Sequence, residues 1–345
     1  MPSNGLVNCM KQAVLLINLG TPDAPTPGKV GKYLTQFLND KRVIDINAIG
    51  RFLLVNLIIV PFRSFKSANL YKHIWTKQGS PLLINSIALK EKLQTQLGEN
   101  YIVELAMRYQ KPSIKNALEK LRKQSPEKIH VLPLYPQYAS SSTGSTIEEV
   151  LNQLKTWEVI PNLNIVSKFY NHPKFIDALL VEAQKHSLSS FDHIMFSYHG
   201  LPERQIIKGS KHYGSNTCNM SSCCSSINQN NQYCYRANCF ETTRQLVKAL
   251  GIEEGKYTTT FQSRLDDKWL KPYSDKVIVD LAKKGVKNIL VFSPAFVADC
   301  LETIHEIGAE YELLFKEHGG EKITLVESLN AGDVWVKALK EIVAG

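Results

Sequence analysis

Short apolar runs rich in branched and aromatic residues alternate along this chain with longer segments in which apolar residues recur every three or four positions. The first pattern is typical of buried β-strands, and the second is typical of helices packed on one face. Eight strands are predicted, at residues 13–19, 101–107, 129–134, 164–169, 193–197, 257–262, 288–292 and 323–327. Helices are predicted between them, including segments at 82–97, 114–123, 242–250 and 275–284.

Apolar strands separated by helices indicate an α/β fold with parallel sheets buried on both faces. We predict two doubly wound halves, at residues 11–160 and 161–330, and a C-terminal helix at 331–345 that packs back on them. A closed eight-stranded barrel is the alternative. It is disfavoured because the spacers 135–159 and 200–232 are uneven in length.

Polar or conformationally unusual residues follow most of the predicted strands. Gly20 follows the first strand, Arg108 and Tyr109 the second, Tyr138 the third and His199 the fifth. Ligands of open α/β sheets bind beyond the carboxyl ends of the strands. Two halves that face each other would therefore gather these loops around one cleft.

Charge and short motifs exclude several classes of function. The net charge of +9 permits an anionic partner, but the basic residues are scattered and no nucleic-acid-binding signature is present, so no nucleic acid is expected. Neither a GxxxxGK[ST] nor a GxGxxG loop joins a strand to a helix, so no nucleotide is expected. Residues 1–11 lack the apolar core of a secretory signal, which predicts a reducing cytoplasm where clustered cysteines hold metal more often than they form disulfides.

Five motifs, in order and in register from residue 13 to the C-terminus, resemble those of the ferrochelatase family. They are LLINLGTP at 15–22, LYPQY at 134–138 with STGS at 142–145, SYHGLP at 197–202, SPAFVADCLET at 293–303 and ESLN at 327–330. The resemblance implies the chelatase fold, with two Rossmann-like domains, each a parallel four-stranded sheet flanked by helices, and a porphyrin cleft between them. It also implies a lyase that inserts Fe²⁺ into protoporphyrin IX to form protohaem, the terminal step of haem biosynthesis.

The resemblance also implies which residues form the site. His199 and Glu302 would face each other across the macrocycle, as catalytic residues and as contacts of the substrate Fe²⁺. The residues that would line the porphyrin pocket are Leu19, Arg108, Tyr109, Tyr138 and Trp269. Cys300 stands where many relatives carry His.

Insertion chemistry suits the two catalytic residue types. The porphyrin must lose two pyrrole protons, and an imidazole accepts protons at neutral pH. Fe²⁺ accepts both imidazole and carboxylate ligands. We therefore predict His199 as proton acceptor and metal contact, with Glu302 as its acidic partner. The alternative for His199 is a loop or helix-capping histidine.

Further carboxylates follow Glu302 at helical spacing. Glu306 and Glu310 complete an i, i+4, i+8 series, which places all three on one helical face. One interpretation is a proton or metal path through Glu306 and Asp299, with Asp299 also orienting the turn or His199. The other is a solvated surface helix, to which we assign Glu310.

Residues 43–66 are predicted to form a membrane-facing lip. Within them, residues 52–60 contain one polar member and are flanked by Arg51, Arg63 and Lys66. This run is too short to span a bilayer. It is either a buried core helix or an interfacial segment on an anionic membrane. The resemblance places it at the mouth of the cleft, which favours membrane-soluble protoporphyrin over the more acidic coproporphyrin and predicts a cytoplasmic enzyme, peripheral on the inner face of the cell membrane.

Five of the seven cysteines fall in one polar insertion at about 212–240. They are Cys218, Cys223, Cys224, Cys234 and Cys239. Four thiolates would hold a [2Fe–2S] cluster, which is the predicted cofactor. Zinc is an alternative, as are free thiols or disulfides. Cys9 and Cys300 stand apart and are not expected to be ligands.

Other functions stay open at this point. A chelatase of the same fold could act on coproporphyrin or insert cobalt into a more reduced tetrapyrrole. From a different class, an iron–sulfur electron-transfer or metal-binding protein would explain the cysteines but not the strand-end motifs. Besides protoporphyrin IX and Fe²⁺, transient contact with the preceding or following enzymes of the haem pathway is a further expectation.

Overall fold

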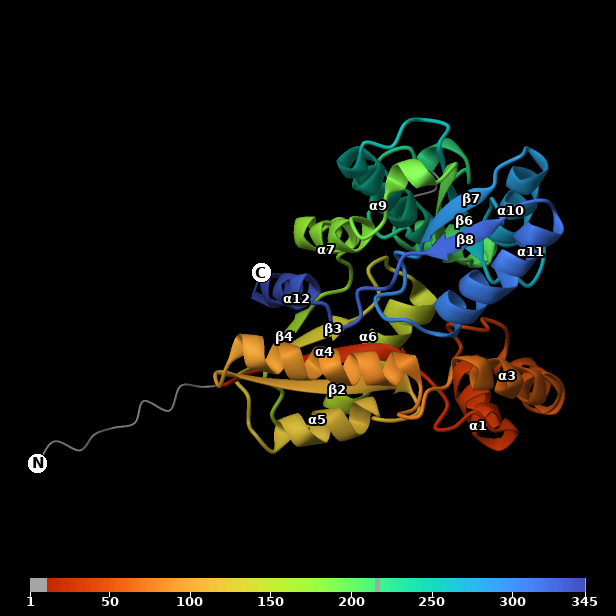
Figure 1. The fold of residues 1–345 in the computed structure, drawn as a ribbon. Coiled ribbons are helices and arrows are strands. Elements are labelled where there is room, and N and C mark those ends of the chain that lie inside the picture. Colours follow the sequence, from red (N-terminus) through yellow and green to blue (C-terminus); the bar gives the residue numbers. More distant parts are fainter. Residues whose placement is uncertain (1–10, 215–217, 345) are drawn as a thin grey trace, which may run out of the picture.

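Two parallel four-stranded sheets form the framework of the protein, as the computed structural model shows for residues 11–214 and 218–344 (Figure 1). The first sheet has the strand order β2-β1-β3-β4 and the second has the order β6-β5-β7-β8. The strands are β1 (Gln12–Gly20), β2 (Tyr101–Tyr109), β3 (Lys128–Pro133), β4 (Asn162–Ile165), β5 (His193–His199), β6 (Tyr257–Gln262), β7 (Asn288–Phe292) and β8 (Lys322–Leu325). The predicted fold class is confirmed, and the two open sheets exclude the barrel alternative.

Helices connect and flank the strands. In the first half they are α1 (Pro27–Leu38), α2 (Ala48–Leu53), η1 (Leu54–Ile59), α3 (Val60–Ile74), α4 (Pro81–Leu97), α5 (Ile114–Arg122), η2 (Ser140–Gly144) and α6 (Ser145–Leu154). The others are α7 (Pro173–Ala183), η3 (Leu188–Ser190), α8 (Glu203–His212), η4 (Ser222–Cys224), α9 (Tyr235–Leu250), α10 (Ser274–Lys283), η5 (Glu302–Tyr311), α11 (Glu312–Glu317) and α12 (Asp333–Ala344).

The elements differ from the predicted ones mainly at their ends. The fourth strand was expected at 164–169, but β4 ends at Ile165 because only residues 162–165 pair with β3. The predicted helix at 242–250 begins earlier, at Tyr235, where buried side chains start inside the cysteine-rich insertion. Since β4 belongs to the first sheet, the chain crosses to the second half beyond the predicted boundary at residue 160.

Each central strand is buried on both faces. In β1, Val14 and Leu16 point into one apolar cluster, whereas Ala13, Leu15 and Ile17 point into the cluster formed with α5 and α6. This period of two on a strand that is apolar throughout is the expected signature of a parallel sheet covered by helices on both sides.

One apolar core runs through both halves. The cluster that holds Val14 and Leu16 of β1 also contains Phe196 of β5 and Trp335 of α12. Helix α12 packs against both α4 and α7, so the C-terminal segment lies where the two halves meet (Figure 1). The two sheets therefore share buried surface, and their relative position is set by packing.

Gly20, at the end of β1, is required by close backbone approach. Its φ is +111°, and a Cβ atom at this position would lie 2.0 Å from the carbonyl oxygen of Tyr109 on the neighbouring strand. Only glycine tolerates both the positive φ and this contact.

Gly20→Ala is expected to lower the free energy of unfolding by about 2 kcal/mol or more, because it combines backbone strain with a backbone clash. Urea unfolding followed by circular dichroism measures the effect. Gly28→Ala in α1 is the matched control, since an added Cβ there meets nothing within 4 Å, and its effect should stay within about 1 kcal/mol. Equal effects of the two substitutions would contradict the argument.

Candidate active site

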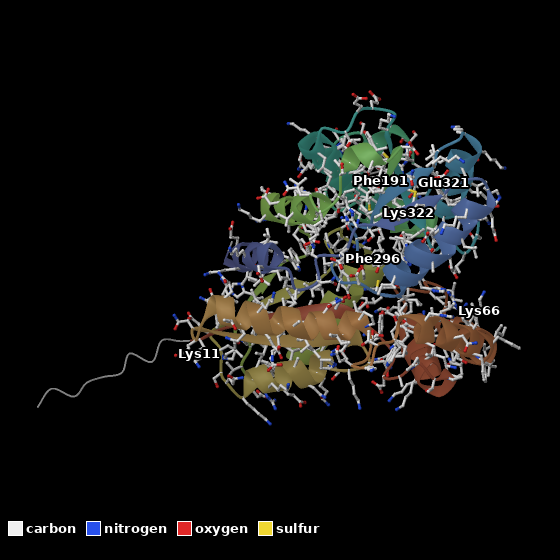
Figure 2. The ribbon with its side chains drawn as sticks, in the orientation of Figure 1. Lys11, Lys66, Phe191, Phe296, Glu321 and Lys322 are labelled. Carbon is white, nitrogen blue, oxygen red and sulfur yellow. The ribbon has the colours of Figure 1, made fainter. Side chains whose placement is uncertain are left out.

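His199 is the last residue of β5 and its ring has a defined orientation. Its Nδ1 lies 2.6 Å from the carbonyl oxygen of Gly200. A carbonyl can only accept, so Nδ1 carries the proton and Nε2 is left with a lone pair. The rings of Trp269 and Phe296 flank His199, each at 6.4 Å between ring centroids. Phe296 lies in the region between the two halves (Figure 2).

Gln262 brings the strand end of His199 and the start of η5 together. It is the register partner of His199 on β6, and its carbonyl accepts from Gly200 N at 2.8 Å. A Cβ on Gly200 would lie 2.7 Å from that carbonyl oxygen, which explains a glycine directly after the histidine. The side-chain amide of Gln262 then donates to the backbone carbonyl of Glu302 at 3.0 Å.

Glu306 and Glu310, which follow Glu302 at helical spacing, have different environments. They lie on η5, a π-helical segment, a class of element frequent at functional sites. Glu306 accepts hydrogen bonds from Gln262, from both the backbone and side chain of Ser263, and from Tyr311. Glu310 is half exposed and pairs with His305 at 3.3 Å. The three carboxylates thus do not form one open row.

Asp299 anchors the turn that precedes η5. Its carboxylate accepts from the Asn330 amide at 2.8 Å and from the Thr303 hydroxyl at 3.2 Å. Asn330 in turn accepts from Asn85 of α4 at 2.8 Å. This chain of bonds links the loop that presents Glu302 to the first half of the molecule.

The predicted pocket residues occupy two kinds of place. Leu19 is half-buried in β1, and Tyr138 and Trp269 are half-buried in the loops after β3 and β6. Arg108 and Tyr109 are tied instead to Asp40, because the Arg108 guanidinium and the Tyr109 hydroxyl both donate to the Asp40 carboxylate, at 2.7 and 2.9 Å. Tyr109 is fully buried, and burial raises the pKa of its hydroxyl group.

Sequence reasoning missed Tyr33 of α1 and Tyr71 of α3. Both are buried close to Glu302, and they share a hydrogen bond. Burial raises the pKa of the Tyr71 hydroxyl, and the Glu302 carboxylate adds to the shift, so Tyr71 stays a proton donor. Cys300 is buried in the same region, where burial and the Glu302 carboxylate raise the pKa of its thiol. The sequence signal that could have identified these two residues is a tyrosine at a position that the helical pattern assigns to the buried face.

The cysteine insertion places four thiols near one another. Cys218 interacts with Cys223, the sulfurs of Cys223 and Cys224 are 3.9 Å apart, and Cys224 shares a hydrogen bond with Cys234. That bond raises the pKa of the Cys224 thiol and lowers the pKa of the Cys234 thiol. Cys239 is fully buried in the core.

No disulfide joins the six cysteines in the described part of the chain. Within residues 11–214 and 218–344, no group of three or more His, Cys, Asp or Glu side chains is already arranged to hold a metal ion. Cys9, which was not expected to be a ligand, lies outside the described residues.

Residues 48–74 form one continuous helix through α2, η1 and α3, far longer than the apolar run within it. By length and composition alone this helix could cross a membrane. Its outer side chains are not those of a core helix, because Ile49 is 75% and Phe62 is 79% exposed. The exposed apolar residues of this helix, here called the apolar face, are Ile49, Phe52, Leu53, Leu57, Ile58, Phe62 and Phe65.

Comparison with known proteins agrees with the geometry. The family model described as ferrochelatase matches residues 11–345. The ferrochelatase of Legionella pneumophila is 45% identical over 336 residues, which cover 97% of this chain and 99% of the relative. The ferrochelatase of Coxiella burnetii is 43% identical over 338 residues, covering 97% and 94%.

Solved structures support the fold. The sirohydrochlorin chelatase SirB from Bacillus subtilis subspecies spizizenii, in complex with cobalt, superimposes with a TM-score of 0.55 at 12% identity over 97% of this chain and 94% of that one. SirB from Bacillus subtilis with Fe³⁺ gives 0.56 at 11% identity over 97% and 96%. At such identity the likeness concerns the chelatase fold alone.

The alternatives from sequence are not favoured, because the family match and the curated relatives all carry the same name and extend over nearly the whole chain. Neither a cobalt chelatase nor an electron-transfer protein accounts for that agreement. The chain therefore belongs to the ferrochelatase family, whose members are lyases that insert iron into a porphyrin.

Proposed function

We propose that this ferrochelatase inserts Fe²⁺ into protoporphyrin IX to form protohaem, with His199 as the acceptor of pyrrole protons and Glu302 as its acidic partner. The observation that carries these roles is the orientation of His199. Its Nδ1–H is bonded to Gly200, and its Nε2 has no hydrogen-bond partner among the described residues, so the basic nitrogen is available to a substrate.

The proton balance explains why a base and a carboxylate are both needed. A free-base porphyrin loses two N–H protons as Fe²⁺ enters, and the product core is neutral. Nε2 of His199 accepts one of these protons and the other leaves to solvent water, and a positioned base of this kind contributes about 10²–10⁴-fold to a rate. The negative charge of Glu302, held near the same strand end by Gln262, attracts Fe²⁺ and stabilises the imidazolium.

Asp299 and Glu306 complete the proposed proton and metal path as fixed charges. Each carboxylate is held by several donors, which leaves it little freedom to carry a proton through space. Their contribution is electrostatic, since negative charge one turn from Glu302 favours the approach of a cation. Asp299 also holds the turn from which Glu302 projects.

The five pocket residues act in two layers in this proposal. Leu19, Tyr138 and Trp269 form the wall against the macrocycle. Arg108 and Tyr109 support that wall from behind through Asp40, and the partly buried Arg108–Asp40 pair keeps the ends of β2 and α1 together.

His199→Ala is expected to lower kcat for Fe²⁺ insertion about 10²–10⁴-fold, because the proton acceptor is lost. The rate is measured anaerobically, by mixing protoporphyrin IX with Fe²⁺ and following the change from free-base to metalloporphyrin bands in the visible spectrum. His318→Ala, at an exposed helix end, is the control and should keep the wild-type rate. A His199→Ala protein that folds and retains full activity would overturn the assignment.

The apolar face supports a second part of the proposal, a peripheral position on the inner face of the cell membrane. Seven exposed apolar side chains on one helix, next to Arg51, Arg63 and Lys66, fit an interfacial segment on an anionic lipid surface. The inner side of the same helix carries Tyr71 beside the cleft. A membrane-soluble porphyrin would thus reach the site without crossing bulk water.

Replacing Phe52, Leu57 and Phe62 together by Ser is expected to weaken binding to phosphatidylglycerol-containing vesicles at least about tenfold, because buried apolar area supplies the affinity. Cosedimentation measures this binding. The matched control replaces Val159, Leu265 and Leu313, which are exposed apolar residues outside the helix. A wild-type protein that does not bind the vesicles, or an equal loss of vesicle binding in the two triple variants, would count against the membrane proposal.

The third part concerns the predicted [2Fe–2S] cluster. The type and number of the donors fit, since four neighbouring thiols are free of disulfides, although within the described residues they are not grouped as a metal site. We name Cys218, Cys223, Cys224 and Cys234 as the ligands, and Cys239 is set aside because it is buried in the core beside Tyr235. Such a cluster, when bound, supplies an electron-transfer group separate from proton removal at His199.

Anaerobically purified protein is expected to show broad visible absorption and equal amounts of iron and acid-labile sulfide. Ser at any of Cys218, Cys223, Cys224 or Cys234 should remove both signals, because each supplies one ligand. Cys239→Ala and Cys300→Ala are the controls and should retain them. A colourless protein that contains zinc would replace the cluster with a zinc site, and a metal-free protein would leave free thiols.

A place on the cytoplasmic face of the membrane would also bring this enzyme near those that supply its porphyrin and use its haem. Transient contact with the preceding or following enzymes of the pathway belongs to the proposal for this reason. The apolar face supports it only through the shared membrane surface.

A further inference from the structure

The first turn of α9 lies between the cysteine insertion and the porphyrin cleft. Its N-cap is Cys234, and Tyr235 begins the helix. The turn is well buried, since Tyr235 is 7% exposed and Asn238 is fully enclosed. One short element therefore carries a proposed metal ligand together with side chains directed at the site.

Two hydrogen bonds run from this turn to predicted site residues. The Tyr235 hydroxyl donates to the backbone carbonyl of His199 at 2.8 Å. The Asn238 side chain accepts from the backbone N–H of Tyr138 at 3.3 Å. Tyr233, just before the turn, packs edge-on against the Tyr138 ring with 5.4 Å between centroids. The turn thus contacts site loops that follow strands of both sheets.

The same helix is bonded to the thiol loop on its other side. Arg244 of α9 donates to the carbonyl of Cys224 at 3.0 Å, and within the loop itself Asn231 donates to the carbonyl of Cys223 at 2.8 Å. The backbone N–H of Asn238 closes the first turn on the Cys234 carbonyl at 2.9 Å. A displacement of the thiols is therefore passed directly to Tyr235 and Asn238.

We propose that Tyr235 is a positioning residue for His199, and that through it the state of the four thiols and the occupancy of the cleft influence each other. The inference rests on the proposed function, because it takes His199 and the thiols in the roles given above. The buried phenol donates to the carbonyl at the end of β5, and that carbonyl belongs to the catalytic residue itself. Coupling of this kind is reciprocal, so porphyrin in the cleft must change the thiols as much as the thiols change the cleft.

The test measures the thiols while the cleft is filled. The full-length protein, after a chelator has removed any metal from the thiols, is alkylated with iodoacetamide with and without protoporphyrin IX and no added Fe²⁺, and peptide mass spectrometry gives the rate at Cys218 and Cys223. These two thiols are half-buried and therefore partly accessible to the reagent. Protoporphyrin is expected to change their rates at least about fivefold in the wild type.

Tyr235→Phe should abolish this change, because it removes only the hydroxyl group that contacts His199. Tyr213→Phe is the matched control, since Tyr213 belongs to the same insertion but is 48% exposed, and among the described residues its hydroxyl group makes only a 3.5 Å contact with Gln232. Tyr213→Phe should behave as the wild type. A Tyr235→Phe protein that keeps the porphyrin-dependent change, or a wild type that never shows it, overturns the inference.

Kinetics supply a second readout for the positioning role. Tyr235→Phe is expected to lower kcat about tenfold with the KM for protoporphyrin unchanged, whereas a merely structural defect would lower the folded fraction measured by thermal unfolding. An unchanged kcat overturns the positioning role. Porphyrin binding is measured by fluorescence in the same samples. Failure of the wild type to bind or metallate porphyrin would contradict the proposed function. Normal turnover together with alkylation rates that do not depend on protoporphyrin would contradict this inference alone.

Discussion

The buried amide of Gln262 is the contact on which the rest of the site depends. It is 1% exposed, and a buried amide is costly unless its donors and acceptors are all bonded. Ser197 of β5 donates to its oxygen at 2.7 Å, while its nitrogen donates to the Glu302 carbonyl and the Glu306 carboxylate of η5. One side chain therefore fixes the strand that ends in His199 against the helix that begins with Glu302.

The position of one half relative to the other follows from packing around this network. A continuous apolar core passes from β1 through α12 to β5, and it is supplemented by the bond between Asn85 and Asn330. Because Asn330 also holds Asp299, the same contact that joins the halves sets the turn before Glu302. The contact between the two halves and the position of the turn before Glu302 are thus determined by one set of interactions.

Two segments at the edge of the fold, the helix at 48–74 and the cysteine insertion, have two features in common. Each carries an unusual set of side chains, exposed apolar residues in one case and half-buried or buried thiols in the other. Each also sends a buried tyrosine inward, Tyr71 towards Glu302 and Tyr235 to the His199 carbonyl. Because a packed interior transmits small displacements, events at either surface can reach His199 and Glu302.

The local sequence pattern was sufficient to predict the strands, the parallel sheets and the strand-end motifs. A strand buried on both faces needs an apolar run, and a close backbone approach needs glycine, as at Gly20 and Gly200. The pattern did not reveal that Tyr109 lies behind the cleft, that Glu306 is bonded to Ser263, or that Tyr33 and Tyr71 stand beside Glu302. Those facts depend on contacts between residues tens to hundreds of positions apart, which only the packing of the two halves brings together. The start of α9 at Tyr235 was likewise decided by burial, since the polar, cysteine-rich sequence before it carries no helical period.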